Sequence, residues 1–232
     1  MNVVIPVFIQ NEETLELTKN AIYSLGNCNL IVVDNNSSVG GGYLRALSTT
    51  YIRNNNNLGY ARSVNQGLKL CTEKYIAIAN NDIRVSPNWK KIAEEVLATP
   101  SVYSCHFRMT DYEEPFSYGD RVVESGMERW CTSSFFVIKS PPRLYDEQYL
   151  NTYEDWDYWM TARKEGWSTA YTDKACYQHH HSFTQQQIPE REENNQRNRE
   201  YFKTKWDRYA EDIFAEQFPE QMAVPYADGF CL

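Results

Sequence analysis

Residues 30–37 read Leu30-Ile31-Val32-Val33-Asp34-Asn35-Asn36-Ser37, an apolar run that ends in a polar segment. A short, continuous apolar run rich in β-branched residues is typical of a strand buried on both faces, as in a parallel sheet. In an open parallel sheet, ligands bind just outside the carboxyl ends of the strands. Asp34 and its neighbours are therefore the first candidates for a binding site.

Similar runs recur through the first hundred residues and alternate with helical patterns. The other apolar runs are Asn2–Phe8, the weaker Tyr51–Arg53, and Tyr75–Ala79. Between and after them, helices are predicted over Glu13–Leu25, about 58–70, and from Pro87 to about Leu97. This alternation predicts an α/β fold, with a mostly parallel sheet that helices cover on both faces. Farther along, strands and hairpins are predicted over 101–140, and helices over 154–166 and about 190–214.

Bulk composition limits the class of protein. The chain has 232 residues, enough for a single domain with an appended terminal segment. Its net charge of −8 argues against a generally basic nucleic-acid-binding surface. The apolar N-terminal run is too short for a signal peptide or a membrane span, and a cytoplasmic protein is expected. The six cysteines are scattered without a CxxC pair, which favours reduced thiols over a disulfide frame or zinc site.

Three strand ends are polar, and two of them carry an aspartate. The segment 8–12 follows the first strand, Asp34 follows the second, and Asn80-Asn81-Asp82 follows Tyr75–Ala79. Ordinary turns also favour Asx residues, so each loop alone has a purely structural alternative. No GxxxxGK[ST] or GxGxxG motif follows a strand, and Gly40-Gly41-Gly42 is expected to be a flexible turn. If a diphosphate binds, a divalent ion held by carboxylate oxygens is the favoured means of neutralising it.

Taken in order, these segments resemble family 2 glycosyltransferases with the GT-A fold, a Rossmann-like α/β architecture. The resemblance covers roughly residues 2–184, and Asn80-Asn81-Asp82 in place of Asp-x-Asp resembles the rhamnosyltransferase-like branch. It implies a GT-A domain over 1–184 and a C-terminal helical extension over 185–232 that packs on it. The matching segments are 4–8, 32–37, 57–67 (Asn57-Leu58-Gly59-Tyr60-Ala61-Arg62-Ser63-Val64-Asn65-Gln66-Gly67), 80–82, 153–157, 163–167 and the histidines after Cys176.

The resemblance implies a nucleotide-sugar donor and residues that contact it. Asp34 would read the base, typically uracil or thymine, although it could instead cap the next helix. The other residues expected to contact the donor are Pro6, Phe8, Asn57, Gly59, Asn65 and Asn81. Gly59 could equally be a turn glycine, and Asn65 a helix-surface residue. The family's Pro-x-Tyr-Asn is spread out here over residues 6–11, so the first loop is expected to be reshaped.

The same resemblance implies Mn²⁺ or Mg²⁺ as a cofactor. Asp82 matches the last aspartate of the metal motif and would hold the ion against the diphosphate. Asn80 replaces the first aspartate, and its carbonyl could ligate directly or through water. His179 and His181 are the candidates for a further ligand; alternation along a strand would place them on one face and His180 on the other.

The acidic segment 154–157 would supply the catalytic base. The resemblance assigns Asp155 to take the proton of the acceptor hydroxyl as that oxygen attacks the anomeric carbon, which inverts the configuration. Glu154 and Asp157 are alternates that could bind sugar or acceptor hydroxyls. Acidic residues also favour a helix N-terminus for electrostatic reasons alone, so a structural role is the alternative.

Two other functions compete with glycosyl transfer. A nucleotidyltransferase would need a Gly-rich loop with a basic residue near the first strand, which residues 8–14 lack. A non-catalytic nucleotide-sugar-binding module would not need both Asp82 and Asp155. The acceptor is left open between a glycan, a protein, a lipid-linked sugar and a modified nucleobase in viral DNA, and the oligomeric state is not indicated.

Overall fold

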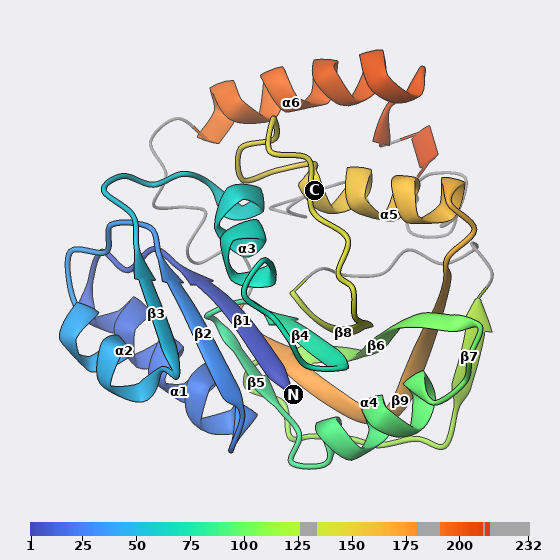
Figure 1. Cartoon of the computed structure of the whole chain (residues 1–232), viewed down its shortest axis with the longest axis horizontal. Helices are drawn as coiled ribbons and strands as arrows, with labels where there is room; N and C mark the ends of the chain where they lie inside the picture. Colours follow the sequence, from blue (N-terminus) through green and yellow to red (C-terminus); the bar gives the residue numbers. More distant parts are fainter. Residues whose placement is uncertain (126–133, 181–190, 211, 214–232) are drawn as a thin grey trace.

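One nine-stranded sheet runs through the molecule, with strand order β3-β2-β1-β4-β8-β6-β9-β5 and with β7 paired to β9. The computed structural model describes residues 1–125, 134–180, 191–210 and 212–213 (Figure 1). The pairs among β3, β2, β1 and β4, and the β6–β9 pair, are parallel. The pairs β4–β8, β6–β8, β5–β9 and β7–β9 are antiparallel. The sheet is therefore mixed, and its β3-β2-β1-β4 side is parallel.

The strands of the first half follow the apolar runs closely. They are β1 (Asn2–Val7), β2 (Asn29–Asp34), β3 (Thr50–Arg53), β4 (Tyr75–Ala79) and β5 (Ile83–Val85). The strands of the second half are β6 (Val102–Asp111), β7 (Val122–Ser125), β8 (Phe135–Lys139) and β9 (Ser168–His179).

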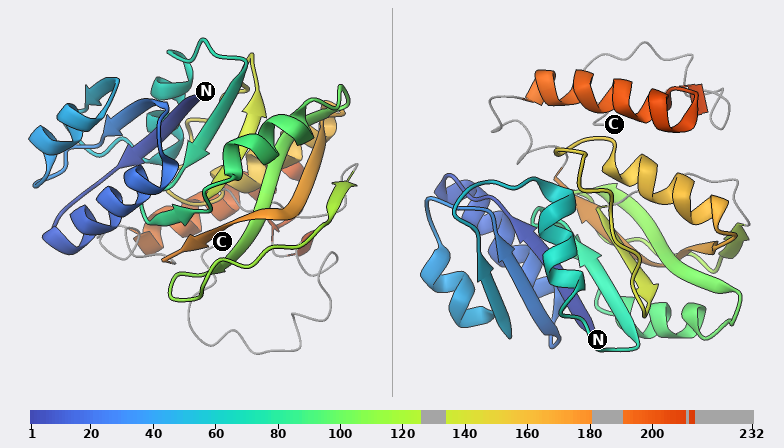
Figure 2. Two further views of the ribbon diagram at one scale, coloured as in Figure 1. Left: turned by 90° about the horizontal axis from the view of Figure 1, so that it is seen from below. Right: turned by 45° about the horizontal axis from the view of Figure 1, so that its top comes forward.

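Helices cover both faces of this sheet, as Figures 1 and 2 show. They are α1 (Glu12–Leu25), α2 (Gly41–Leu47), α3 (Tyr60–Leu68), α4 (Trp89–Leu97), α5 (Glu154–Lys164) and α6 (Arg191–Trp206). Within the described residues, none of them is long and apolar enough to cross a membrane.

Alternation along the strands divides the core into two layers. Val3, Ile5 and Val7 of β1 join the cluster under α1, α2 and α4, whereas Val4 joins the cluster under α3 and α5. Successive side chains of a strand point to opposite faces, so a strand buried on both faces must be apolar at every position. That requirement is why the runs that start the chain are continuous rather than alternating.

A third cluster attaches α6 to the outside of α5 (Figure 1). Phe202 of α6 is fully buried against Tyr149, Tyr153 and Trp156. Aromatic side chains of this polar helix therefore cover the segment that precedes α5 together with the first turn of α5.

Several sequence expectations can be compared directly. The α/β class, the helix over 154–166 and the helix after residue 190 are confirmed, and the last two end at Lys164 and Trp206. The expectation of a flexible turn at Gly40-Gly41-Gly42 is wrong, because Gly40 precedes α2 with a φ of 81° and the other two glycines lie in that helix. Cys28, Cys71, Cys105 and Cys176 are free thiols, and the other two cysteines lie outside the described residues.

Candidate active site

The carboxyl end of β2 holds a fully buried carboxylate. Asp34 lies opposite Arg53 in the parallel β2–β3 register, and Arg53 forms an ion pair with it. The Tyr51 hydroxyl donates to the same carboxylate oxygen, and the backbone amide of Ser37 donates to the other at 2.7 Å. A buried carboxylate is stable only when charge and hydrogen bonds compensate its lost hydration, and these three groups do so. Arg53 is 40% exposed, so this charged cluster reaches the surface.

Beside it, Asn35 ties together the segment that leads into α3. Its Oδ1 accepts from Ser63 Oγ at 2.7 Å and from Asn54 Nδ2 at 2.9 Å. Asn57 Oδ1 accepts from the amide of Gly59 at 3.0 Å, which shapes the turn at the start of α3. Gly59 has a φ of 84°, and an added Cβ would lie 3.1 Å from Leu150 Cδ2. Glycine is therefore required here both by the backbone conformation and by the close approach of residue 150.

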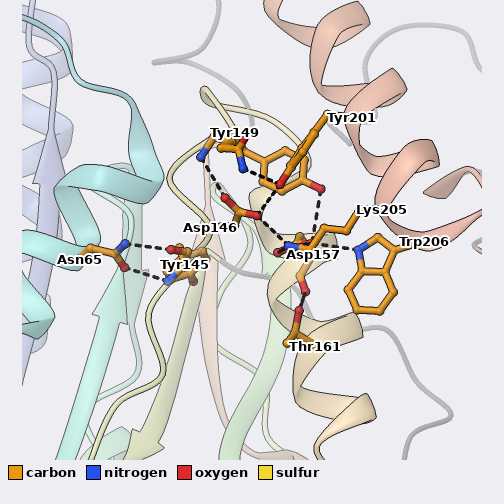
Figure 3. Close-up of polar contacts among 10 residues, drawn as sticks. Asn65, Tyr145, Asp146, Tyr149, Asp157, Thr161, Tyr201, Lys205 and Trp206 are labelled. Carbon is orange, nitrogen blue, oxygen red and sulfur yellow. Dashed lines mark hydrogen bonds and ion pairs between the residues drawn. The ribbon is translucent and has the colours of Figure 1, made fainter.

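Asn65 lies on the inner side of α3 and binds another part of the chain (Figure 3). Its Nδ2 donates to the Tyr145 carbonyl at 2.9 Å and to Glu147 Oε1 at 2.9 Å, and its Oδ1 accepts from the Tyr145 amide at 2.8 Å. The alternative of a helix-surface position is excluded, since Asn65 is buried. Here Asn65 fixes the segment after β8, which brings the Tyr145 ring beside Tyr60.

Asp82 follows β4 and meets the end of β9. The antiparallel β5–β9 register places His179 opposite Ile83, and His179 Nε2 lies 3.2 Å from Asp82 Oδ1. The other ring nitrogen of His179 lies 3.3 Å from Ser134 Oγ. The buried side-chain amide oxygen of Asn80 (Oδ1) has no hydrogen-bond partner, and Asp82 Oδ1 has none besides His179. Carboxylate, imidazole and amide oxygens are ligand types that suit Mn²⁺, so these residues fit a divalent ion.

The expected metal ligands do not all meet at one place. No group of three or more His, Cys, Asp or Glu side chains placed to hold a metal occurs among the residues that the structure describes. His181 lies outside the described residues, and the ring of His180 packs against Tyr112 instead. Of the expected metal ligands, the structure therefore brings together Asp82 and His179, and Asn80 lies two residues before Asp82.

The acidic start of α5 shares one environment with Asp82. The pKa of the Tyr60 hydroxyl is raised well above its usual value, first by desolvation and then by the negative charges of Glu154, Asp155 and Asp82. These carboxylates come from the end of β4 and the start of α5, and their negative charges all oppose ionisation of this hydroxyl. Asp155 is half-exposed, and its Oδ1 accepts from the amide of Trp156 at 2.8 Å.

Glu154 is a buried carboxyl group at the same helix end. Its Oε2 is inaccessible to solvent and has no hydrogen-bond partner. Burial and then the charge of Asp155 raise its pKa to about 8. The group is therefore mostly protonated at neutral pH, and Asp155 is the carboxylate of the pair that is positioned to accept a proton.

Four other expected residues contact other segments or lie in or next to β1. Asp157 is buried and accepts from Trp206 Nε1 at 2.8 Å, while Lys205 Nζ lies 2.8 Å from it (Figure 3). Asn81 donates to Thr18 Oγ1 of α1 at 3.0 Å. Pro6 is buried within β1 opposite Val33, whereas Phe8 is half-buried just beyond the strand.

Two contributors to this region escaped the sequence analysis. Arg53 is one, and its signal was the charged residue that ends β3 directly beside β2. Tyr60 is the other, since it follows Gly59 within a segment already singled out and its ring meets Tyr145 edge-on with centroids 5.9 Å apart. To predict the role of either residue, one must know which segments are neighbours in the fold.

Comparisons with known proteins identify the family and the fold of the chain. The family model described as Glycosyl transferase family 2 matches residues 2–140. No curated protein sequence matches the chain. The S. aureus TarS crystal structure aligns with a TM-score of 0.69 and 14% identity over 99% of this chain and 44% of that one. At this identity the likeness shows the fold alone, and the chain spans less than half of that neighbour's length.

Two further solved structures are similar and contain ligands. TarS 1–349 in complex with UDP-GlcNAc aligns with a TM-score of 0.67 and 11% identity, over 99% of this chain and 74% of that one. The mannosyltransferase PcManGT from Pyrobaculum calidifontis, in complex with GDP-Man and Mn²⁺, aligns with a TM-score of 0.55 and 15% identity, over 75% of this chain and 55% of that one. With the family model covering more than half of the sequence, the chain belongs to glycosyl transferase family 2.

Proposed function

We propose that this chain is an inverting glycosyltransferase that moves a sugar from a UDP- or dTDP-sugar to an acceptor hydroxyl. The observation that carries the proposal is the set of carboxylates at the end of β4 and the start of α5 (Asp82, Glu154 and Asp155), with His179 Nε2 3.2 Å from Asp82 Oδ1. A cluster of carboxylates at the carboxyl edge of a parallel sheet is suited both to a metal-bound diphosphate and to proton abstraction. UDP-GlcNAc and Mn²⁺ in similar solved structures support the ligand class.

In the proposed reaction, Asp155 accepts the proton of the acceptor hydroxyl. The oxygen lone pair attacks the anomeric carbon, and the bond from that carbon to the diphosphate oxygen breaks. The nucleoside diphosphate leaves with the bonding electron pair, so attack from the opposite side inverts the configuration. Glu154, protonated at neutral pH, can donate a hydrogen bond to a sugar or acceptor oxygen without competing for the proton.

Asp82 and His179 would hold Mn²⁺ or Mg²⁺, with Asn80 able to add an oxygen. The ion would supply charge neutralisation for the leaving diphosphate. Asp34, with Arg53 and Tyr51 on its carboxylate, would form the base-binding end. Asn57 and Gly59 would shape the wall beside the nucleotide, with Pro6, Phe8 and Asn81 at its edges. Asn65 would act by fixing Tyr145.

We also propose a division of the chain into two parts. Residues 1–184 form the GT-A domain, and 185–232 form an extension that packs on it. The contacts of Phe202 with Tyr149 and Tyr153 support such packing. The chain in the similar TarS structure is longer than this one, because the alignment covers only 44% of it. The acceptor specificity of the whole protein is therefore also a proposal.

A donor panel tests the function. The chain is incubated with Mn²⁺ and a series of UDP-, dTDP- and GDP-sugars, and slow hydrolysis of each donor is measured. The proposal expects turnover of at least one UDP- or dTDP-sugar. The Asn80-Asn81-Asp82 motif supports the rhamnosyltransferase-like branch and predicts faster turnover of a dTDP-deoxyhexose than of a UDP-hexose. Failure of every donor to bind or turn over would refute the enzymatic function.

A further inference from the structure

The turn that leads into α5 has an unfavourable backbone conformation. Asn151 has a φ of 62° and Tyr153 a φ of 68°, although neither is glycine. The left-handed region costs an ordinary residue about 1 kcal/mol, so such residues persist only where surrounding contacts hold them. Tyr153 immediately precedes Glu154 and Asp155. The conformation of this turn therefore sets the direction in which both acidic side chains project.

Helix α6 supplies one set of those contacts through Asn198, which is 1% exposed. Its Nδ2 donates to the Leu150 carbonyl at 3.0 Å and to the Thr152 carbonyl and Thr152 Oγ1, both at 2.9 Å. Its Oδ1 accepts from the Leu150 amide at 3.4 Å. A single buried side chain thus satisfies the backbone on both sides of Asn151.

Helix α3 supplies the opposite contact. The amide of Tyr60 donates to Asn151 Oδ1 at 3.0 Å. The turn is therefore held from the side of the carboxylates by α3 and from the outside by α6. Releasing the outer contact would free the turn to relax toward ordinary backbone angles, which would move Asp155 relative to Tyr60 and Asp82.

We propose that Asn198 is a positioning residue, which holds the 150–153 turn so that Asp155 faces the acceptor. This inference rests on the proposed function of Asp155 and adds a role for the C-terminal extension. Asn198 touches neither donor nor acceptor in this account. Reactions that depend on a positioned base lose large factors in rate for small displacements, on the order of 10²-fold for about 1 Å.

An independent attachment of α6 makes the proposal testable. Lys205 Nζ lies 2.7 Å from Asp146 and 2.8 Å from Asp157, and Trp206 donates to Asp157 at 2.8 Å (Figure 3). These contacts remain when Asn198 is changed, so the helix should stay docked while the turn loses its hydrogen bonds.

The experiment compares Asn198→Ala with Ile213→Ala. Ile213 is 3% exposed and belongs to the same apolar cluster around α5 and α6, but its side chain has no polar atom to hold the turn. Donor hydrolysis with Mn²⁺ is measured for each variant, together with the melting temperature and UDP affinity. We expect kcat to fall at least about tenfold in Asn198→Ala, with the KM for the donor and UDP affinity within about twofold of wild type. Thr152→Val, which removes one of the three acceptors, should give a smaller fall in kcat.

Hydrogen exchange gives a readout that needs no activity. Amide exchange over residues 150–156 should accelerate in Asn198→Ala and less so in Ile213→Ala at an equal loss of melting temperature. Unchanged exchange, or a kcat loss that merely follows melting temperature across both variants, would overturn the role of Asn198. A wild-type protein that turns over no donor would instead overturn the proposed function, and with it the catalytic meaning of the turn.

Discussion

His179 Nε2 lies 3.2 Å from Asp82 Oδ1, although the two residues come from opposite halves of the chain. The antiparallel pairing of β5 with β9 brings them together, since Ile83 and His179 are partners in that ladder. Both side chains are largely buried, since that of Asp82 is 5% exposed and that of His179 is 11% exposed. A carboxylate and an imidazole are thus brought together just beyond the point where β4 ends.

Removing this pair should remove the metal dependence of nucleotide binding. In wild type, we expect Mn²⁺ to strengthen UDP binding at least about tenfold, equivalent to about 1.4 kcal/mol, and EDTA to reverse that gain. Asp82→Ala and His179→Ala should lose most of it because each removes a ligand. His180→Ala is the matched control, since its ring packs against Tyr112. Calorimetric titration of UDP with and without Mn²⁺ measures the effect, and a full Mn²⁺ gain in Asp82→Ala would contradict the assignment.

Changing the proposed base should affect chemistry and leave binding intact. Asp155→Asn keeps the shape of the side chain but cannot accept the acceptor's proton, so kcat should fall by about 10²–10⁴. UDP affinity should stay near the wild-type value because the nucleotide contacts lie on other elements. Asp207→Asn, at a fully exposed acid, is the control. Single-turnover transfer assays measure both variants, and wild-type kcat in Asp155→Asn would eliminate this mechanism.

The sequence alone predicted a residue's position well where that position depends only on the strand or helix that contains the residue. The runs before Asp34 and Asp82 had to be continuous and apolar because both faces of the sheet are covered, and their ends had to be polar because they reach the edge. Those two facts located the candidate site. The helix at Glu154 was also predictable, since acidic residues at its start and Gly166 beyond its end follow ordinary capping preferences.

Roles that depend on neighbouring segments were not predictable. Arg53 meets Asp34 only because the β2–β3 register aligns them, and register depends on the whole sheet. Asp157 and Asp155 have the same side chain in the same acidic run, yet Asp157 binds Lys205 and Trp206 of α6. Helix geometry turns residues two positions apart to different faces, and only the packing of α6 decides what each face meets.

The raised pKa of Glu154 predicts a pH-dependent stability. Its native pKa of about 8 lies above the ordinary glutamate pKa of 4.5, so the folded state binds this proton more tightly than the unfolded state. The associated stability is complete below about pH 4.5 and is lost as the pH rises through about 8.

Glu154→Gln should remove that loss, because the neutral amide has a similar shape and no proton to release. We expect the variant to exceed wild type in the free energy of unfolding at pH 8 and to differ less from it at pH 5. Urea unfolding at both pH values measures this, with Glu165→Gln as the control for an exposed glutamate on the same stretch of chain. An equal difference at both pH values would show that Glu154 is ionised in the native protein.

The ion pair between Lys205 and Asp157 should stabilise the attachment of α6 far more than the exposed ion pair between Lys203 and Asp207. Lys205 is 31% exposed and Asp157 4%, so removing the ammonium leaves a buried carboxylate with only the Trp206 and Tyr149 donors. We expect Lys205→Met to lower the free energy of unfolding by about 1–3 kcal/mol. Lys203→Met is the matched control, because its partner Asp207 is fully exposed and an ion pair in water contributes little.

A double-mutant cycle isolates this interaction from the other effects of each substitution. Asp157→Asn and Lys205→Met should be coupled, since the second change costs less once the carboxylate has lost its charge. Lys203→Met should add to Asp157→Asn without coupling. Chemical unfolding of all the variants supplies the energies. Additivity of Asp157→Asn and Lys205→Met would mean that this ion pair adds no stability to the attachment of α6.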